Sequence, residues 1–300
     1  MIPKVIHYCW IGGAPMPELA EQCIASWKAH MPEWQIMRWD EATLSQALSK
    51  KPIPSPCPKG KGEETTHGST PQDEHSWLDY MPIYVKQAYE ARKFAFVSDY
   101  VRLWALEQYG GLYMDVDFEV FRPFDELMDK YSAFAGYEGS KRKPVMMGVL
   151  ASEPHGAWVR DMLSTYETRT FYKSPLTGNP SPVTLEYDLT PNTSYFSDRL
   201  EAQGFVADGT EKDFYVKSIS NFKFQISNLE EPTFFLHVFP VHYFCPVLTT
   251  GEDVRTEETY CEHKGESSWA TNKGWKAKLL KLLEPQWKTR IIKLKRRILG

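Results

Sequence analysis

The alternation of apolar and polar positions predicts strands and helices in turn along the first half of the chain. Lys4–Trp10 is apolar enough to form a buried first strand, whereas Trp34–Trp39 alternates as a second strand. Between them, Glu18–His30 has helical spacing, and Tyr84–Phe94 has it again further along. Strands that alternate with helices are typical of an α/β sandwich with a mainly parallel sheet.

Residues 98–119, SDYVRLWALEQYGGLYMDVDFE, form the most informative segment. Ser98 is placed to cap a helix that runs to about Tyr109, and Gly110-Gly111 is a typical helix stop. On the strand predicted next, alternate side chains share a face. One face would hold Tyr113, Asp115, Asp117 and Glu119, and the other Met114, Val116, Phe118 and Val120.

Two acids in the pattern D-x-D on a buried strand need a compensating cation. A hard divalent metal with oxygen ligands supplies that charge, and it can also hold a phosphate. A solvated strand end with incidental acids is the alternative. The apolar opposite face and the preceding helix favour a site at the carboxyl end of a sheet strand, where open α/β folds bind ligands.

Further candidates each leave two interpretations open. Asp99 and Arg102 lie one helical turn apart, and they form either a surface ion pair or a pair that binds ligand hydroxyls. Trp10, beside Gly12-Gly13, either fills the core or stacks on a nucleobase. His263 either lies on the surface or completes a metal site. The donors after it, suited to a diphosphate, are Ser267, Ser268 and the Trp269 indole.

Composition indicates one large domain or two small ones. The five cysteines show no C-x-x-C pair, which favours a reduced cytosolic setting over a disulfide framework. We expect neither a signal peptide nor a membrane-spanning helix. Residues 50–76, rich in Pro, Gly and small polar residues, predict a surface loop, and 170–235 predict helices and loops.

The C-terminal segment differs in charge from the rest of the chain. Residues 273–300 hold ten Lys and Arg and one acid, whereas the other 272 residues hold 25 basic and 38 acidic side chains. An apolar stripe with helical spacing runs through this segment and includes Trp275 and Trp287, although Pro285 should kink it. A basic amphipathic helix suits an anionic membrane surface. Packing of the stripe on the catalytic domain is the alternative, and nucleic-acid binding fits less well because the body is acidic.

Three motifs in order, IPKVIHYCWIGG, FVSDYVRLWALEQYGGLYMDVDFEVFRPFDEL and HKGESSW, resemble the DXD-containing sugar transferases. That family includes yeast α-mannosyltransferases, bacterial capsule and O-antigen transferases, and the glucosylating domains of clostridial toxins. The resemblance covers roughly residues 1–270. It implies a GT-A-type, Rossmann-like fold, a nucleotide-diphosphate sugar donor, a divalent cation (Mn²⁺, or Mg²⁺) and retention of the anomeric configuration.

The resemblance also implies roles for single residues. Trp10 matches the tryptophan that stacks on the base, Asp99 and Arg102 match residues that grip the donor sugar, and Tyr113 lies nearby. Asp115 matches the first DXD acid, which contacts ribose and the metal shell. The direct metal ligand is matched by Asp117. The third ligand is expected from Glu262, His263 or Glu266; we favour His263, with Ser268 and Trp269 on the β-phosphate.

The expected protein is therefore a retaining hexosyltransferase with a catalytic domain at 1–272 and a basic helical tail at 273–300. We expect a UDP-sugar donor and a polysaccharide or lipid-linked oligosaccharide acceptor of capsule or O-antigen synthesis. Its expected location is the cytoplasm, on the inner face of the cell membrane. The alternatives are a toxin-like effector that glycosylates a host protein, and a non-catalytic nucleotide-sugar-binding module.

Overall fold

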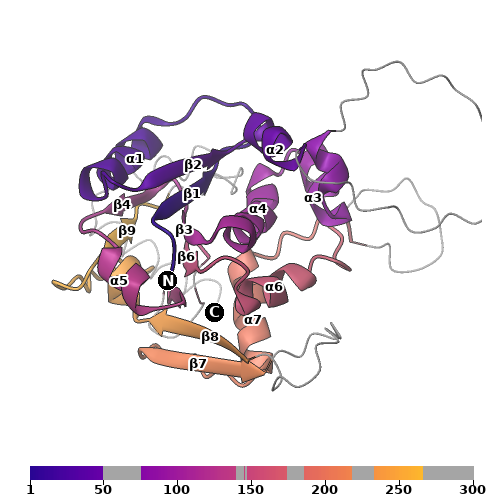
Figure 1. Ribbon diagram of the computed structural model, residues 1–300. Helices are drawn as coiled ribbons and strands as arrows, with labels where there is room; N and C mark the ends of the chain where they lie inside the picture. The colour runs from indigo at the N-terminus through magenta and orange to yellow at the C-terminus, as the bar shows by residue number, and fades with distance from the viewer. Residues whose placement is uncertain (50–75, 140–144, 146, 174–185, 218–232, 266–300) are drawn as a thin grey trace, which may run out of the picture. The chain divides into compact units, whose positions relative to one another are not determined.

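A mixed seven-stranded sheet forms the centre of the molecule (Figure 1). The computed structural model describes residues 1–49, 76–139, 145, 147–173, 186–217 and 233–265. The strand order is β2-β1-β3-β6-β5-β8-β7. Its strands are β1 (Val5–Cys9), β2 (Gln35–Trp39), β3 (Gly111–Met114), β5 (Ala133–Gly136), β6 (Val149–Ser152), β7 (Lys212–Lys217) and β8 (Thr233–Phe239).

Most strands of the sheet point the same way. β1 pairs in parallel with β2 and β3, and β5 pairs in parallel with β8. The antiparallel pairs are β3 with β6, β5 with β6, and β7 with β8. Hence β2, β1, β3, β5 and β8 share one direction, and β6 and β7 run against them. The residues that follow β1, β3 and β5 consequently emerge at one edge of the sheet.

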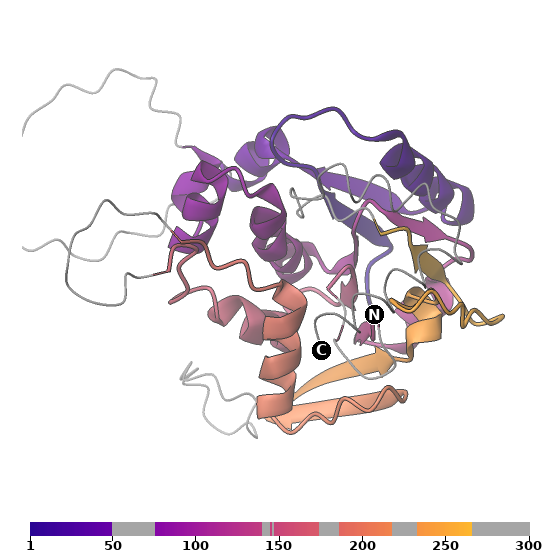
Figure 2. The same ribbon diagram turned by 180° about the vertical axis from the view of Figure 1, so that it is seen from behind.

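Helices cover both faces of the sheet, as Figures 1 and 2 show from opposite sides. One side holds α3 (Ile83–Glu90), α4 (Phe94–Tyr109), α6 (Ala157–Ser164) and α7 (Asn192–Ala202). The other side holds α1 (Glu18–His30), α5 (Asp125–Lys130) and a ribbon of β4 (Phe118–Val120) and β9 (Cys261–His263). The remaining helices are α2 (Glu41–Leu48), α8 (Val241–Phe244) and the 3₁₀ turn Trp77–Tyr80. The predicted α/β class and the mainly parallel sheet are confirmed.

A two-glycine turn joins the buried helix α4 to the central strand β3. Gly110 ends α4 with φ 63°, and Gly111 has φ 110°, which are angles that favour glycine. The Gly110 carbonyl lies 2.7 Å from His7 Nε2, and Trp39 Nε1 donates to His7 Nδ1 at 3.1 Å. Burial lowers the His7 pKa to about 4, so the ring is neutral and donates from Nε2 to Gly110. The start of β3 is thereby fixed against β1.

Two local predictions about residues 98–119 are wrong. Helix α4 begins at Phe94, so Ser98 lies inside the helix, where its hydroxyl donates to the Ala95 carbonyl at 2.7 Å. The D-x-D pair is not on a continuous strand, because β3 ends at Met114 and β4 begins at Phe118. Tyr113, on the strand itself, is buried with 1% exposed. The backbone turn, rather than the strand period, places the acids.

The segment 170–235 is also richer in strand than expected, since it contains β7 and the start of β8 besides α7. Several predictions fall outside the described residues: the loop at 50–75, Glu266, Ser267, Ser268, Trp269 and the tail at 273–300. The domain boundary at 272/273 therefore stays a prediction. In the part of the chain that the structure describes, no helix is both long and apolar enough to cross a bilayer.

Candidate functional site

The D-x-D acids lie in the turn between β3 and β4, at the edge where β1, β3 and β5 end. The backbone N–H of Asp115 donates to the Gly148 carbonyl at 2.8 Å, which extends the β3–β6 pairing by one residue. Phe118 N–H then donates to the Asp115 carbonyl at 3.2 Å and closes the turn. A Cβ on Gly148 would lie 3.1 Å from Asp115 Oδ2 and 2.7 Å from the Phe118 ring. This tight packing fixes Asp115.

Arg102 connects the D-x-D turn to helix α4. Its Nη1 lies 3.3 Å from Asp115 Oδ2 and 2.5 Å from the Met147 carbonyl, and its Nη2 lies 3.1 Å from Asp99 Oδ1. The guanidinium also stacks over the Tyr113 ring at 4.7 Å, and the Tyr113 hydroxyl donates to Asp115 Oδ1 at 2.8 Å. Arg102 is only 5% exposed, so this is not the weak surface ion pair that spacing alone allowed. It aligns two carboxylates across two elements.

Asp99 is a buried acid with a perturbed pKa. Burial raises its pKa to about 7, against the attraction of Arg102, and the negative charge of Asp115 acts in the same direction as burial. The pKa of Asp115 is also raised, again mainly by burial, with Arg102 opposing. Acids with perturbed pKa values that share one charged partner are typical of functional sites.

Asp117 contacts His263, which comes from a segment 146 residues away. Strand β9 pairs antiparallel with β4, and this register places His263 opposite Phe118. The imidazole stacks on the Phe118 ring at 4.7 Å, with its Nε2 3.1 Å from Asp117 Oδ2. The Lys264 N–H donates to the Asp117 carbonyl at 2.8 Å. The structure thus brings together Asp117 and His263, and their role as metal ligands stays a prediction.

The acids and the imidazole suit a divalent cation by their chemistry. Carboxylate oxygens with one imidazole are ligands that Mn²⁺ accepts. Burial raises the pKa of Asp115, and the charge of Asp117 acts in the same direction, so a nearby cation would favour the ionised carboxylate. In the described ranges, however, no group of three or more His, Cys, Asp or Glu side chains is placed to hold one ion. Binding would require Asp115, Asp117 and His263 to rearrange.

One acid of this edge was missed by sequence reasoning. Glu138 comes two residues after β5, and burial raises its pKa to about 7. The charges that act on it include His263, which lowers the pKa, and Asp115 and Asp117, which raise it. Glu138 therefore belongs to the same electrostatic cluster. No motif contains Glu138 and no strand was predicted before it, so the sequence analysis had no signal for this residue.

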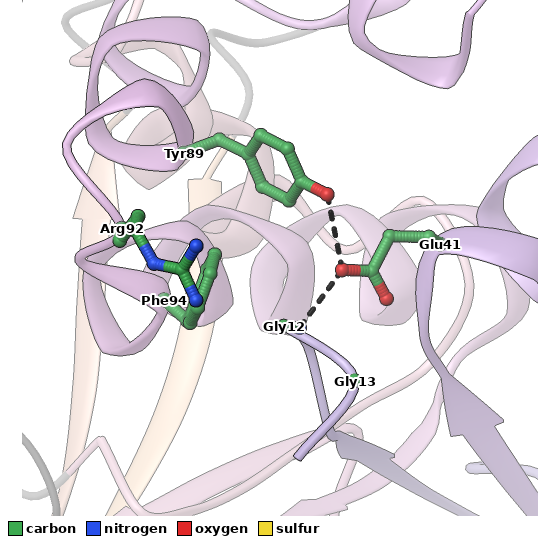
Figure 3. Close-up of a pocket in the computed structure, with 6 residues that line it drawn as sticks. All are labelled: Gly12, Gly13, Glu41, Tyr89, Arg92 and Phe94. Atoms are coloured by element: carbon green, nitrogen blue, oxygen red, sulfur yellow. Dashed lines mark hydrogen bonds between the residues drawn. The ribbon is translucent and has the colours of Figure 1, made fainter.

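Trp10 lies at the same edge, directly after β1, and is partly buried against the core. Its indole donates to the Ala14 carbonyl at 2.7 Å, which holds the glycine loop. The glycines that follow it in the chain line a cavity of about 350 Å³, whose lining residues are Gly12, Gly13, Glu41, Tyr89, Arg92 and Phe94 (Figure 3). Glu41 Oε1 accepts from the Gly12 N–H at 2.8 Å and from the Tyr89 hydroxyl at 3.2 Å. None of the cavity residues except Gly12 and Gly13 was singled out from the sequence.

A comparison with protein families matches residues 17–134 to the glycosyltransferase sugar-binding region containing DXD motif. The match includes α4, the D-x-D turn and α5.

Two curated proteins show local sequence similarity. Inositol phosphoceramide mannosyltransferase 1 of Schizosaccharomyces pombe is 26% identical over 132 residues, which is 43% of this chain and 32% of that protein. Glucan organizing enzyme 1 of Cryptococcus neoformans var. grubii is 32% identical over 85 residues, which is 26% of this chain and 23% of that protein. The chain thus spans a third or less of these relatives.

Two solved structures are similar over about half of the chain. The PaToxG glycosyltransferase matches at TM-score 0.37 and 18% identity, over 54% of this chain and 59% of its own. The ligand-free glycosyltransferase domain of the YGT toxin matches at TM-score 0.32 and 14% identity, over 54% and 62%. The family match and the D-x-D turn are independent of these weak likenesses. The resemblance to the DXD-containing sugar transferases is therefore confirmed, through the match of residues 17–134 to the glycosyltransferase sugar-binding region containing DXD motif.

Proposed function

We propose that this chain is a metal-dependent retaining glycosyltransferase that moves a hexose from a nucleotide-diphosphate sugar to an acceptor hydroxyl. One observation supports this most strongly: Arg102 joins Asp99 to Asp115, and the second D-x-D acid, Asp117, meets His263 beside them. Acids for the sugar and acids for the diphosphate would thus be adjacent, within or next to the matched family region.

The proposed roles follow the positions of the side chains. Asp115, Asp117 and His263 would hold Mn²⁺ or Mg²⁺, after the Asp117–His263 contact of 3.1 Å opens. A bound divalent cation neutralises the diphosphate and so makes it a better leaving group. Asp99 would accept hydrogen bonds from donor sugar hydroxyls. Arg102 and Tyr113, both buried, would act by orienting Asp99 and Asp115 rather than by reaching far into the site.

The nucleoside would lie near Trp10 and the cavity that the following glycines line. The indole would stack on the base, and Glu41 in the cavity could accept a further hydrogen bond from a ribose hydroxyl. UDP is the proposed carrier, from the resemblance of the Trp10 motif. Ser268 and Trp269, outside the described residues, would donate to the β-phosphate.

Front-face attack is the proposed route for retention. The acceptor oxygen forms a bond to the anomeric carbon on the side from which the phosphate oxygen departs. The acceptor proton passes to the leaving phosphate oxygen, so no enzyme nucleophile is required. Trapping of a glycosyl-enzyme adduct would contradict this route.

A polysaccharide or a lipid-linked oligosaccharide of capsule or O-antigen synthesis is the proposed acceptor. The basic segment 273–300 supports this, because ten Lys and Arg residues would draw the enzyme to an anionic inner membrane surface. One of the two curated relatives is named for a lipid, inositol phosphoceramide. A toxin-like effector that glycosylates a host protein is the alternative within the class.

Donor hydrolysis tests the proposal directly. Purified protein is incubated with a panel of UDP- and GDP-sugars plus Mn²⁺, and release of the free sugar and the nucleoside diphosphate is measured. We expect turnover of one donor, and a loss of about 100-fold or more in Asp117→Ala, since that variant removes a proposed metal ligand. Chelation should abolish turnover in the wild type.

Asp129→Ala is the matched control, because Asp129 is an exposed acid outside the site. It should retain full turnover. Absence of turnover with every donor, or full turnover in Asp117→Ala, would refute the proposal and favour a non-catalytic nucleotide-sugar-binding module.

A further inference from the structure

The Arg169 guanidinium lies in a cage of three tyrosine rings behind Asp99. Its Cζ atom is 3.7 Å from the ring centre of Tyr195 and 4.6 Å from those of Tyr84 and Tyr166. The rings come from α3, α7 and the turn after α6, so three helical segments enclose one cation. Ring faces are negative and stabilise a cation held over them.

Hydrogen bonds explain only part of this packing, because the guanidinium donates one to the Tyr166 hydroxyl oxygen. Arg169 Nε and Nη1 are inaccessible to solvent, and neither has a hydrogen-bond partner in the part of the chain that the structure describes. Leaving buried donors without partners costs free energy. The compensation is electrostatic, because Arg169 lies within the field of two carboxylates, Asp99 and Asp188, and lowers the pKa of both.

The cage is also joined to the Asp99 backbone. The Tyr166 hydroxyl donates to Asn192 Oδ1 at 3.1 Å, and Asn192 Nδ2 donates to the Asp99 carbonyl at 3.5 Å. On the far side of the cage, the Tyr195 hydroxyl donates to Asp188 at 2.5 Å. Arg169 therefore occupies the centre of a packed unit that contacts the helix turn carrying Asp99.

We propose that Arg169 is a positioning residue for Asp99: a second, partly buried cation besides Arg102, whose tyrosine cage is joined through Asn192 to the helix turn that aligns Asp99 for the donor sugar. This inference rests on the proposed function of Asp99. The charge of Arg102 is shared, because Arg102 binds Asp115 and the Met147 carbonyl as well as Asp99. Arg169, which acts on Asp99 and Asp188 but not on Asp115 in the same way, would supply the further positive charge.

The sign of the pH effect follows from the groups around Asp99. Arg102 and Arg169 lower its pKa, whereas burial and Asp115 raise it, to a net value of about 7. The other titratable groups in its field are Tyr84, Tyr166 and Cys9. Removing Arg169 therefore raises the Asp99 pKa, so the ionised form is lost at a higher pH than in the wild type.

Three variants test the proposal: Arg169→Met, which keeps an unbranched chain in the cage without charge, Arg169→Lys, which keeps the charge, and Arg160→Met. Arg160 lies on α6, is half exposed and pairs with Glu107, so its variant controls for loss of a nearby cation. The Asp99 carboxyl is titrated by ¹³C NMR, and kcat/KM for donor hydrolysis is measured against pH.

For Arg169→Met we expect the Asp99 titration and the acid limb of kcat/KM to move up by about one pH unit. At pH 7 the ionised fraction would then fall about fivefold, with kcat/KM. Arg169→Lys should restore most of the limb position, and Arg160→Met should leave it unchanged. Binding of the nucleoside diphosphate without its sugar should be the same in all variants.

An unmoved Asp99 titration in folded Arg169→Met would overturn the inference, and so would an equal shift in Arg160→Met. If Arg169→Met does not fold, Arg169→Lys is used in its place. A lowered thermal midpoint together with a wild-type acid limb of kcat/KM would support the role of the Arg169 charge. A shifted acid limb would contradict that role. The NMR readout is independent of turnover. A wild type without donor hydrolysis refutes the proposed function alone, and a wild-type titration in Arg169→Met refutes this inference alone.

Discussion

At the scale of single residues, the candidate site is a set of charges, from the buried Asp99 and Arg102 to the exposed His263, that balance one another in pairs. Arg102 forms ion pairs with Asp99 and Asp115, and His263 contacts Asp117. Glu138 has no such ion pair within the described residues, although it lies in the field of the same groups. A third carboxylate without its own cation adds to the negative potential that a metal ion would neutralise.

Glu138 is accordingly predicted to support metal binding. Glu138→Gln, of nearly the same shape but neutral, should raise the half-saturating Mn²⁺ concentration for donor hydrolysis by about 10-fold. Glu126→Gln, at an acid whose side chain is 74% exposed, should not change it. An unchanged metal dependence in Glu138→Gln would remove Glu138 from the site.

Sequence patterns located most of these residues but not their contacts. The spacing of Asp99 and Arg102 predicted a pair on one helical face, and the pair is present at 3.1 Å. The contact of Arg102 with Asp115 was not predictable, because it depends on how α4 packs over β3. Nor was the role of Arg169 visible, since its cage is built from residues 84, 166 and 195.

At the scale of elements, the turns set the geometry of the site. The α4–β3 turn brings the Asp99 helix alongside the D-x-D turn, and the β4–β9 ribbon brings His263 across it. The glycines of the first turn were visible in the sequence. The ribbon was not, because its two strands have only three residues each and are separated by about 140 positions.

Alanine variants of Gly110, in the α4–β3 turn, and of Gly204, elsewhere in the chain, distinguish the cost of backbone strain from the cost of close packing. Gly110→Ala would place a Cβ 2.5 Å from Pro154 Cδ and 2.9 Å from Pro3 Cδ, at φ 63°. Gly204→Ala has a similar positive φ of 96° but meets no atom within 4 Å. We expect a loss of about 1–2 kcal/mol in Gly204→Ala, from backbone strain. Gly110→Ala should lose about 1–3 kcal/mol more, from overpacking.

Urea unfolding monitored by circular dichroism measures both losses. Equal losses in the two variants would show that the prolines yield and that the turn is not tightly packed.

At the scale of the whole molecule, the chain has an acidic body and a basic end. If residues 273–300 bind a membrane, their deletion should abolish binding to vesicles with anionic lipid, because each Lys or Arg near such a surface contributes about 1 kcal/mol. Donor hydrolysis should be largely retained. Cosedimentation with anionic and with neutral vesicles measures the first, and sugar release measures the second.

Binding to anionic vesicles that survives the deletion would contradict the membrane role. A deletion that instead destabilises the body would support the alternative, in which the apolar stripe packs on the catalytic domain.

The sequence by itself determined the α/β class, the helix–Gly-Gly–D-x-D order and the resemblance to the DXD-containing sugar transferases, because these depend on local periodicity and on residues close together in the chain. The tertiary structure decided which charges meet. Arg102 reaches Asp115, His263 reaches Asp117, and Glu138 and Arg169 join the same field only because distant segments converge at one edge of the sheet. The free energy of a buried charge depends on its surroundings in space, and those are not encoded in spacing along the chain.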